Sequence, residues 1–131
     1  MSAEADYIRA EIESILQTVD MIQDLLNKKN LSNYETIALG KLLQDVYTGI
    51  ERILRNKLES QGIKVIKNES WHKELLLAAK NNSIITQQQF EKLRKLLVYR
   101  HMQIHGYGYM LEEQRLRELA ISIPICLQRF Y

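Results

Sequence analysis

Hydrophobic residues recur at every third or fourth position along almost the whole chain, and only one proline and five glycines interrupt them. This spacing is typical of amphipathic α-helices, in which one apolar stripe faces the core. Only the short stretch IKVIKN (63–68) alternates, and we interpret it as an extended link with at most a short strand at 63–66. The pattern predicts an all-α, up-and-down helical bundle with four main helices and a fifth C-terminal helix.

The first two expected helices carry long apolar stripes. The first covers residues 3–28, and its stripe includes Leu16. The second begins after an N-cap at Ser32 or Asn33, includes Ile37 in its stripe and ends at Gly62. These two helices should supply much of the core.

The remaining helices are shorter. The third is expected at 70–81 with Ser70 as its N-cap, and the fourth follows the cap Thr86 and runs to residue 105. The fifth covers 111–130 and should kink or restart at Pro124, because proline cannot donate to the helical hydrogen bonds. Trp71 and His72 are assigned to packing and capping of the third helix, and Cys126 to the core.

Composition narrows the class of protein. A chain of 131 residues with no linker or repeat predicts a single domain over 1–131. Lys and Arg outnumber Asp and Glu by only 18 to 16, so any contact with nucleic acid must depend on local groups. One cysteine suits a reducing cytoplasm, and neither a secretory signal nor an apolar run long enough to span a membrane is present. We expect a cytoplasmic protein with no membrane contact.

The stretch YRHMQIHGYGY (99–109) concentrates polar chemistry at the end of the fourth helix. It follows an apolar stripe whose spacing of three and four leads directly to Arg100. An arginine in such a position must be paired, reach solvent, or face a cleft or a second subunit. His101 and His105 are one helical turn apart, and Gly106 and Gly108 flank Tyr107.

Two structural readings compete with a catalytic one. Arginine, histidine and tyrosine at a helix end often interact with the helix dipole as a C-terminal cap. Alternatively, the i, i+4 spacing of His101 and His105 suits zinc, but this needs a third ligand, for which His72 or Glu112 is a guess. No cysteine or second histidine pair lies nearby, so we assign no metal and no cofactor.

The motif RHMQIHGY (100–107) resembles the R-x4-H-x-Y signature of HepT-like ribonuclease toxins of the HEPN superfamily. The segment SWHKELL (70–76), the aromatic residue before Arg100 and the charged last helix are also similar, so the resemblance covers nearly the whole chain. It implies a HEPN-type bundle with catalytic Arg100 and His105 and a supporting His101. It further implies that Tyr107, or less favourably Tyr109, is modified by AMPylation.

The chemistry of the residue types agrees with this resemblance. Metal-independent RNA cleavage needs a proton-transfer group near neutral pKa, such as histidine, and a fixed cation, such as arginine, at the phosphate. Five residues apart, Arg100 and His105 project about 140° apart on an ideal helix. The family solves this by dimerisation, so the resemblance implies a homodimer with the motif at a composite cleft.

The resemblance also implies partners. They are an RNA substrate, such as tRNA or mRNA, and a cognate MntA-type nucleotidyltransferase antitoxin. Two alternatives remain open: a non-catalytic HEPN-type module that binds nucleotide or RNA, and a structural helical dimer. An intact set of Arg100, His105 and Tyr107 favours the endoribonuclease toxin.

Overall fold

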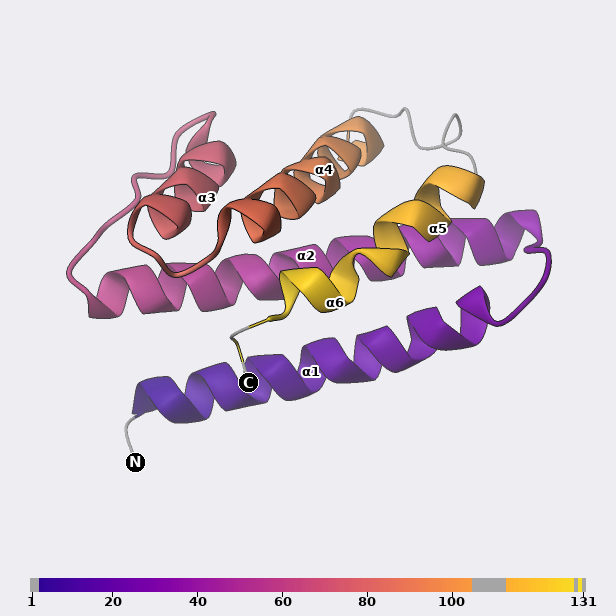
Figure 1. Ribbon diagram of the computed structural model, residues 1–131, viewed down its shortest axis with the longest axis horizontal. Coiled ribbons are helices and arrows are strands. Elements are labelled where there is room, and N and C mark those ends of the chain that lie inside the picture. Colours follow the sequence, from indigo (N-terminus) through magenta and orange to yellow (C-terminus); the bar gives the residue numbers. More distant parts are fainter. Residues whose placement is uncertain (1–2, 105–112, 129, 131) are drawn as a thin grey trace.

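The computed structural model describes residues 3–104, 113–128 and 130, and the described residues form helices without any strand (Figure 1). The all-α prediction and the helical bundle are therefore confirmed. In chain order the helices are α1 (Ala3–Leu26), α2 (Asn33–Ser60), α3 (Trp71–Asn81), α4 (Gln87–Ile104), α5 (Glu113–Ile121) and α6 (Ile123–Cys126).

The long helix α2 is the centre of the bundle. It contacts α1, α3, α4 and α5, with α1 on one side and the α3–α4 hairpin on the other (Figure 1). A Cβ atom added at Gly49 would lie 2.7 Å from Cγ1 of Ile15, so this glycine lets α1 approach α2 closely. Helix α2 contributes eight fully buried apolar side chains: Leu39, Leu43, Val46, Tyr47, Ile50, Ile53, Leu54 and Leu58.

Two residues of the expected stripes do not face the core. Leu16 of α1 is 39% exposed and Ile37 of α2 is 65% exposed, so their predicted burial is wrong. Helix α1 packs chiefly against α2 and buries only Ile15 and Ile22 completely. The apolar stripe of each helix is therefore wider than the surface that the two helices bury against each other.

Local hydrogen bonds fix both ends of α2. Of the two expected caps, Ser32 is the N-cap: its hydroxyl accepts from the Glu35 N–H, and the Glu35 carboxylate accepts from the Ser32 N–H. At the other end Gly62 adopts φ 79°, and Ile63 N–H donates to the Leu58 carbonyl at 2.9 Å. This is a Schellman motif, and it confirms the predicted stop at Gly62.

The caps of the next two helices differ from each other. Ser70 occupies the N-cap position of α3, but its hydroxyl makes no capping bond and contacts Asn68 and Glu74 instead. Thr86 is a true cap of α4, because its hydroxyl accepts from the Gln89 N–H at 3.1 Å. The preceding stretch 63–68 contains no strand and is a link, as expected.

The expected fifth helix consists of two helices, α5 and α6, which separate at Ser122. Pro124 stands in the first turn of α6, where a missing N–H costs nothing. The predicted restart is thus confirmed, and α6 begins at Ile123, one residue before the proline. Residues 105 and 111–112, at the expected ends of the fourth and fifth helices, lie outside the described part of the chain.

Within the described ranges, every helix is too short or too polar to cross a lipid bilayer.

Candidate active site

Arg100 lies on the side of α4 that faces the bundle. The residues one turn and two turns before it, Leu96 and Leu93, are fully buried, whereas Arg100 itself is half-buried. Its Nη1 atom lies 3.3 Å from Nε2 of His72, which belongs to the first turn of α3. The arginine that interrupts the apolar stripe is therefore bonded to a neighbouring helix.

The same histidine contacts a buried carboxylate. Nδ1 of His72 lies 2.6 Å from Oε2 of Glu51, and Glu51 on α2 is only 5% exposed. Three helices thus contribute one polar residue each to a line that we call the Glu51–His72–Arg100 cluster. Because a buried carboxylate is stable only when it is bonded, the cluster constrains how α2, α3 and α4 pack.

The hydrogen-bond chemistry of arginine decides the state of His72. A guanidinium group has donors and no acceptor, so Nε2 of His72 must accept from Arg100. The proton of the neutral ring is then on Nδ1, which donates to the Glu51 carboxylate. This bond uses one of the five guanidinium N–H donors, which leaves Arg100 with donors that suit phosphate oxygens.

Tyr47 lies at the buried end of the cluster. Its side chain is fully buried, and its hydroxyl lies near the Glu51 carboxylate but makes no hydrogen bond of standard geometry among the described residues. Burial raises the pKa of the Tyr47 hydroxyl and the nearby Glu51 carboxylate raises it further, while Arg100 lowers it. Tyr47 is therefore a neutral phenol close to both charges.

The outer side of His72 is covered by an aromatic ring. The ring centroids of Trp71 and His72 are 3.9 Å apart, and the Lys67 ammonium lies 5.5 Å from the Trp71 ring centroid. His72 consequently has only 22% of its side chain exposed. The imidazole is held between a buried acid, a cation and an indole.

The other expected site residues are placed differently. His101 is exposed on α4, directly after Arg100, and is about 100° away around the helix. His105 and Tyr107 lie outside the described residues, so their position relative to Arg100 stays a prediction. Within the described ranges no group of three or more histidine, cysteine, aspartate or glutamate side chains could hold a metal ion.

Comparison with known proteins identifies the family to which the chain belongs. Residues 38–131, which include most of α2, all of α3 to α6 and every residue of the cluster, match the family model described as HepT-like protein. The chain belongs to the HepT-like family. Residues 1–37, which include α1, lie outside the match. No curated protein matches this HepT-like chain, and no solved structure matches it.

Sequence reasoning assigned His72 to packing and capping of its helix, named it otherwise only as a guess for a third zinc ligand, and overlooked Glu51. A signal was present, because Glu51 interrupts the apolar stripe of α2 just as Arg100 interrupts that of α4. Two residues of opposite charge on the core-facing sides of two helices are expected to interact, directly or through a third polar group, because a buried charge needs a partner. In this HepT-like chain the third group is His72.

Proposed function

We propose that this HepT-like chain is a metal-independent endoribonuclease toxin in which Arg100 and His105 are the catalytic residues. The observation that carries the proposal is the Glu51–His72–Arg100 cluster, which holds a cation with spare donors at the end of α4. A cation positioned in advance stabilises charge that develops at a phosphate in the transition state. His101 supports the site from the adjacent position.

The proposed reaction uses the RNA itself as nucleophile. The 2′-oxygen forms a bond to phosphorus while the bond from phosphorus to the 5′-oxygen breaks. Histidine takes the proton of the 2′-hydroxyl, and the leaving 5′-oxygen receives a proton from a second group. The products are a 2′,3′-cyclic phosphate and a 5′-hydroxyl end, and Arg100 neutralises the additional negative charge on the phosphate oxygens.

We further propose that the catalytic cleft is formed by a homodimer. Arg100 and His105 project about 140° apart on one helix, so one copy of the motif makes a poor two-sided site. A second copy brings the missing group to the opposite side of the phosphate. Sedimentation at micromolar concentration should show a dimer, and a monomer that still cleaves RNA would contradict this.

The decisive experiment for the activity is RNA cleavage by purified protein with and without EDTA. Cleavage should survive the chelator and leave cyclic phosphate ends, and Arg100→Ala and His105→Ala should each lose at least about a hundredfold in kcat. His101→Ala should lose less. Arg9→Ala, an exposed arginine of α1, is the control and should match the wild type. Activity that EDTA abolishes and zinc restores would support the zinc reading instead.

Control of the toxin is proposed to act on Tyr107. A nucleotidyltransferase antitoxin would transfer AMP from ATP to the tyrosine oxygen with release of pyrophosphate, and the new phosphodiester would compete with RNA phosphate for Arg100. Mass spectrometry after co-expression should find AMP on Tyr107, with Tyr109 a weaker candidate. Tyr107→Phe should keep cleavage and escape silencing. Silencing with both tyrosines unmodified would contradict this mechanism.

A further inference from the structure

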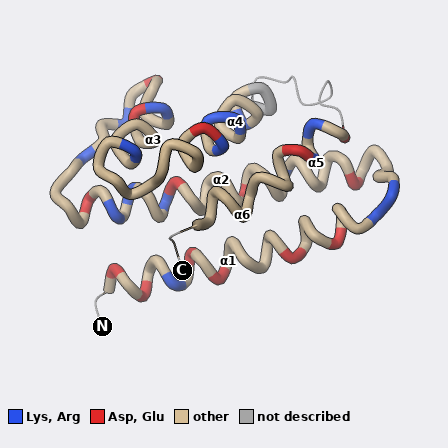
Figure 2. Tube along the Cα trace, viewed as in Figure 1, with Lys and Arg blue, Asp and Glu red and all other residues tan. Residues whose placement is uncertain are grey.

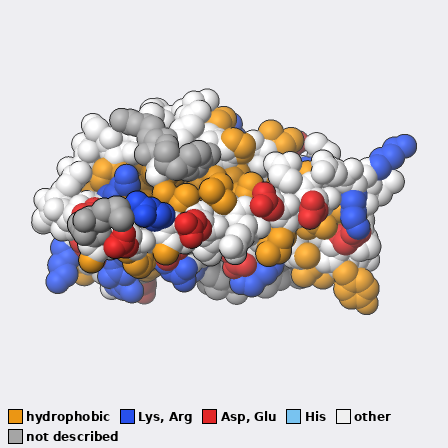
Figure 3. Space-filling model, turned by 90° about the horizontal axis from the view of Figure 1, so that it is seen from below, with side chains coloured by type: hydrophobic (Ala, Val, Ile, Leu, Met, Phe, Trp, Pro, Cys, Tyr) orange, Lys and Arg blue, Asp and Glu red, His pale blue; other side chains and the backbone are white. Residues whose placement is uncertain are grey.

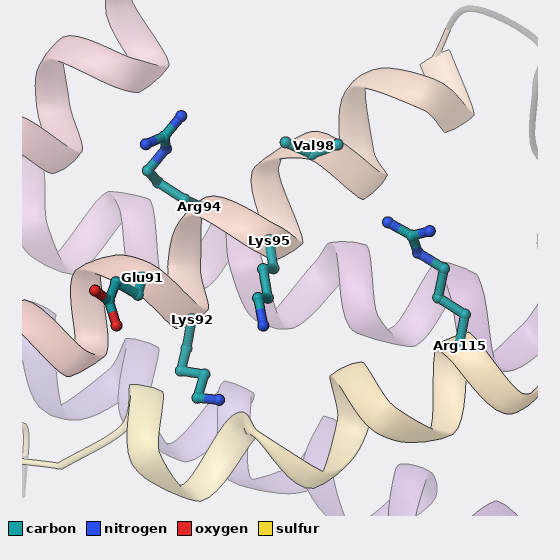
Figure 4. Close-up of a pocket in the computed structure, with 6 residues that line it drawn as sticks. All are labelled: Glu91, Lys92, Arg94, Lys95, Val98 and Arg115. Atoms are coloured by element: carbon teal, nitrogen blue, oxygen red, sulfur yellow. The ribbon is translucent and has the colours of Figure 1, made fainter.

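A basic groove separates α4 from α5. Two adjoining hollows of about 390 and 300 Å³ share three cationic lining residues, Lys92 and Lys95 of α4 and Arg115 of α5. Figure 4 shows both lysines extending from α4 toward the C-terminal helices and Arg115 rising from α5 toward α4. Val98, which is 48% exposed, adds apolar surface to the first hollow.

The positive charges of this groove are not neutralised within the fold. Five other cations of the described chain pair with carboxylates: Lys28, Lys41, Arg52, Arg55 and Arg117. Across the same described residues, no such pair involves a lysine or arginine of the groove. Its two carboxylates, Glu91 and Glu118, accept instead from Gln87 at 3.2 Å and Gln114 at 3.4 Å. The groove therefore offers unpaired positive charge.

Basic and acidic residues are distributed unevenly over the rest of the molecule. Residues 61–104 carry eight lysines and arginines and three glutamates, whereas α1 carries six acidic residues and one arginine. Helix α1 and the α3–α4 hairpin lie on opposite sides of α2 (Figure 2). Figure 3, seen from the α1 side, shows acidic side chains spread along that face with hydrophobic side chains between them, and Lys and Arg side chains chiefly toward its ends and one edge. An overall charge of +2 thus conceals an uneven distribution of charge between α1 and residues 61–104.

We propose that the α4–α5 groove binds the phosphate backbone of single-stranded RNA and anchors the substrate outside the catalytic cluster. The ligand class follows from the unpaired lysines and arginine, since a row of cations without paired carboxylates attracts a polyanion by release of its counterions. The described lining residues offer no ring on which a base could stack, so the contact that they make is to phosphates and is independent of sequence. The RNA identity of the polyanion rests on the proposed function.

The groove and the catalytic cluster use different faces of α4. Lys95 and Arg100 project about 140° apart, and Lys92 precedes Arg100 by about 12 Å along the helix axis. The groove therefore contacts other phosphates of the RNA strand than the reacting phosphate, which Arg100 contacts. Loss of the groove should raise KM and leave kcat nearly unchanged.

The test measures binding of a short fluorescent 2′-O-methyl RNA, which retains the phosphates but lacks the 2′-hydroxyl needed for cleavage. The variant Lys92→Gln, Lys95→Gln, Arg115→Gln removes three groove charges. At about 100 mM NaCl it should bind on the order of 100-fold more weakly than the wild type, at about 0.7 logarithmic units per phosphate contact. The slope of log Kd against log salt should fall by about 2 for the same reason.

A matched variant separates the groove from bulk charge. Lys29→Gln, Lys41→Gln, Arg52→Gln removes the same total charge from exposed positions outside the groove. It should bind RNA within about twofold of the wild type with an unchanged salt slope. Equal losses in both triple variants, or no loss in the groove variant, would overturn the proposal. Circular dichroism melts confirm that each variant is folded.

Two further measurements distinguish RNA from a second protein copy as the occupant of the groove, and distinguish failure of the groove proposal from failure of the proposed nuclease activity. Sedimentation of the groove variant should match the wild type; salt-sensitive self-association that only this variant loses would mean that an acidic surface of a second copy fills the groove, and the proposal would be wrong. Wild-type protein that binds RNA through the groove without cutting it would refute the nuclease and leave the groove standing. Cleavage with an unchanged KM in the groove variant would refute the groove alone.

Discussion

His72 joins a buried acid to a surface-reaching cation, and its two ring nitrogens have separate roles. Nδ1 donates to Glu51 and Nε2 accepts from Arg100. The first bond satisfies a carboxylate that is almost completely buried, so it should matter for stability. The second orients the guanidinium, so it should matter for transition-state charge. We regard His72 as a positioning residue that acts through Arg100.

Two amide substitutions separate these roles. Asparagine places its amide nitrogen near the position of Nδ1, so His72→Asn should keep the Glu51 bond, lose less than about 1 kcal/mol of stability and lower kcat about tenfold with KM unchanged. Glutamine places a polar atom near Nε2, so His72→Gln should keep most of kcat but lose about 2 kcal/mol by leaving Glu51 unbonded. Urea unfolding and cleavage kinetics measure both effects.

His72→Ala is the reference for this pair, because it removes both bonds and should show both losses. If the asparagine and glutamine variants instead behave alike in stability and in kcat, the imidazole serves only as packing. Tyr47→Phe provides a neighbouring control: it removes a buried hydroxyl without a partner in the described structure and should cost less than about 0.5 kcal/mol.

Arg100 could be singled out from sequence because a charge at a stripe position is a local signal. The identity of its partner could not, because His72 is 28 residues and Glu51 is 49 residues away in the chain. Which helix faces which is a property of tertiary packing, and the period of each stripe does not contain it. The roles of His105 and Tyr107 still depend on the family motif.

At the scale of the helices, hydrogen bonds of the Gln89 side chain connect the start of α4 to the C-terminal part of the chain. Its amide oxygen accepts from Thr86 N–H at 2.8 Å, and its amide nitrogen donates to the carbonyls of Cys126 at 3.3 Å and Gln128 at 2.7 Å. The side chain is fully buried, so each bond replaces one to water. A single amide thus closes a capping box and holds α6 in place.

Gln89→Ala should therefore lower the free energy of unfolding by about 2 kcal/mol, since the Thr86 N–H and the carbonyls of Cys126 and Gln128 lose their partner and the Cys126 carbonyl is buried. Urea denaturation should show a lower midpoint at an unchanged m value. Gln88→Ala, at an exposed neighbouring position, should change stability by less than about 0.5 kcal/mol. Similar losses in both variants would mean that only helix propensity had changed.

The turn between α1 and α2 should make stability depend on acid pH. The Lys28 ammonium, and after it the Ser32 N–H, lower the pKa of Glu35 from 4.5 to about 2. A lowered pKa stabilises the folded state above pH 4.5, and this contribution disappears as the pH falls through about 2. The stability difference between wild type and Glu35→Gln should shrink over this range. A constant difference in urea midpoints would contradict the assignment.

The helices themselves could be predicted because their signals are local. The apolar period, the capping box at Ser32 and the glycine at position 62 lie within a few residues of the ends that they determine. Pro124 likewise marks the restart of the last helix within two residues of the break at Ser122. The exposure of Ile37 could not be read in this way, because it depends on which part of α2 its neighbours cover, and this is decided only when the bundle assembles.

For the molecule as a whole, Cys126 should report on global unfolding. The thiol is fully buried between α4 and the chain end, and burial raises its pKa to about 12. The reactive species is the thiolate, so modification requires both opening and deprotonation. Ellman's reagent should react at least about a thousandfold more slowly with native protein than with urea-unfolded protein. Rapid reaction of the folded protein would show a local opening near α6.

The acidic α1 and the basic α3–α4 hairpin on opposite sides of α2 make the protein a dipole with almost no net charge. The net attraction between such a dipole and a distant polyanion is weak. Within about one Debye length, roughly 8 Å at physiological salt, the field of the polyanion exerts a torque on the dipole. An RNA strand would therefore rotate the protein more than it would draw the protein in. Encounters would therefore favour one orientation, with the acidic helix turned toward solvent.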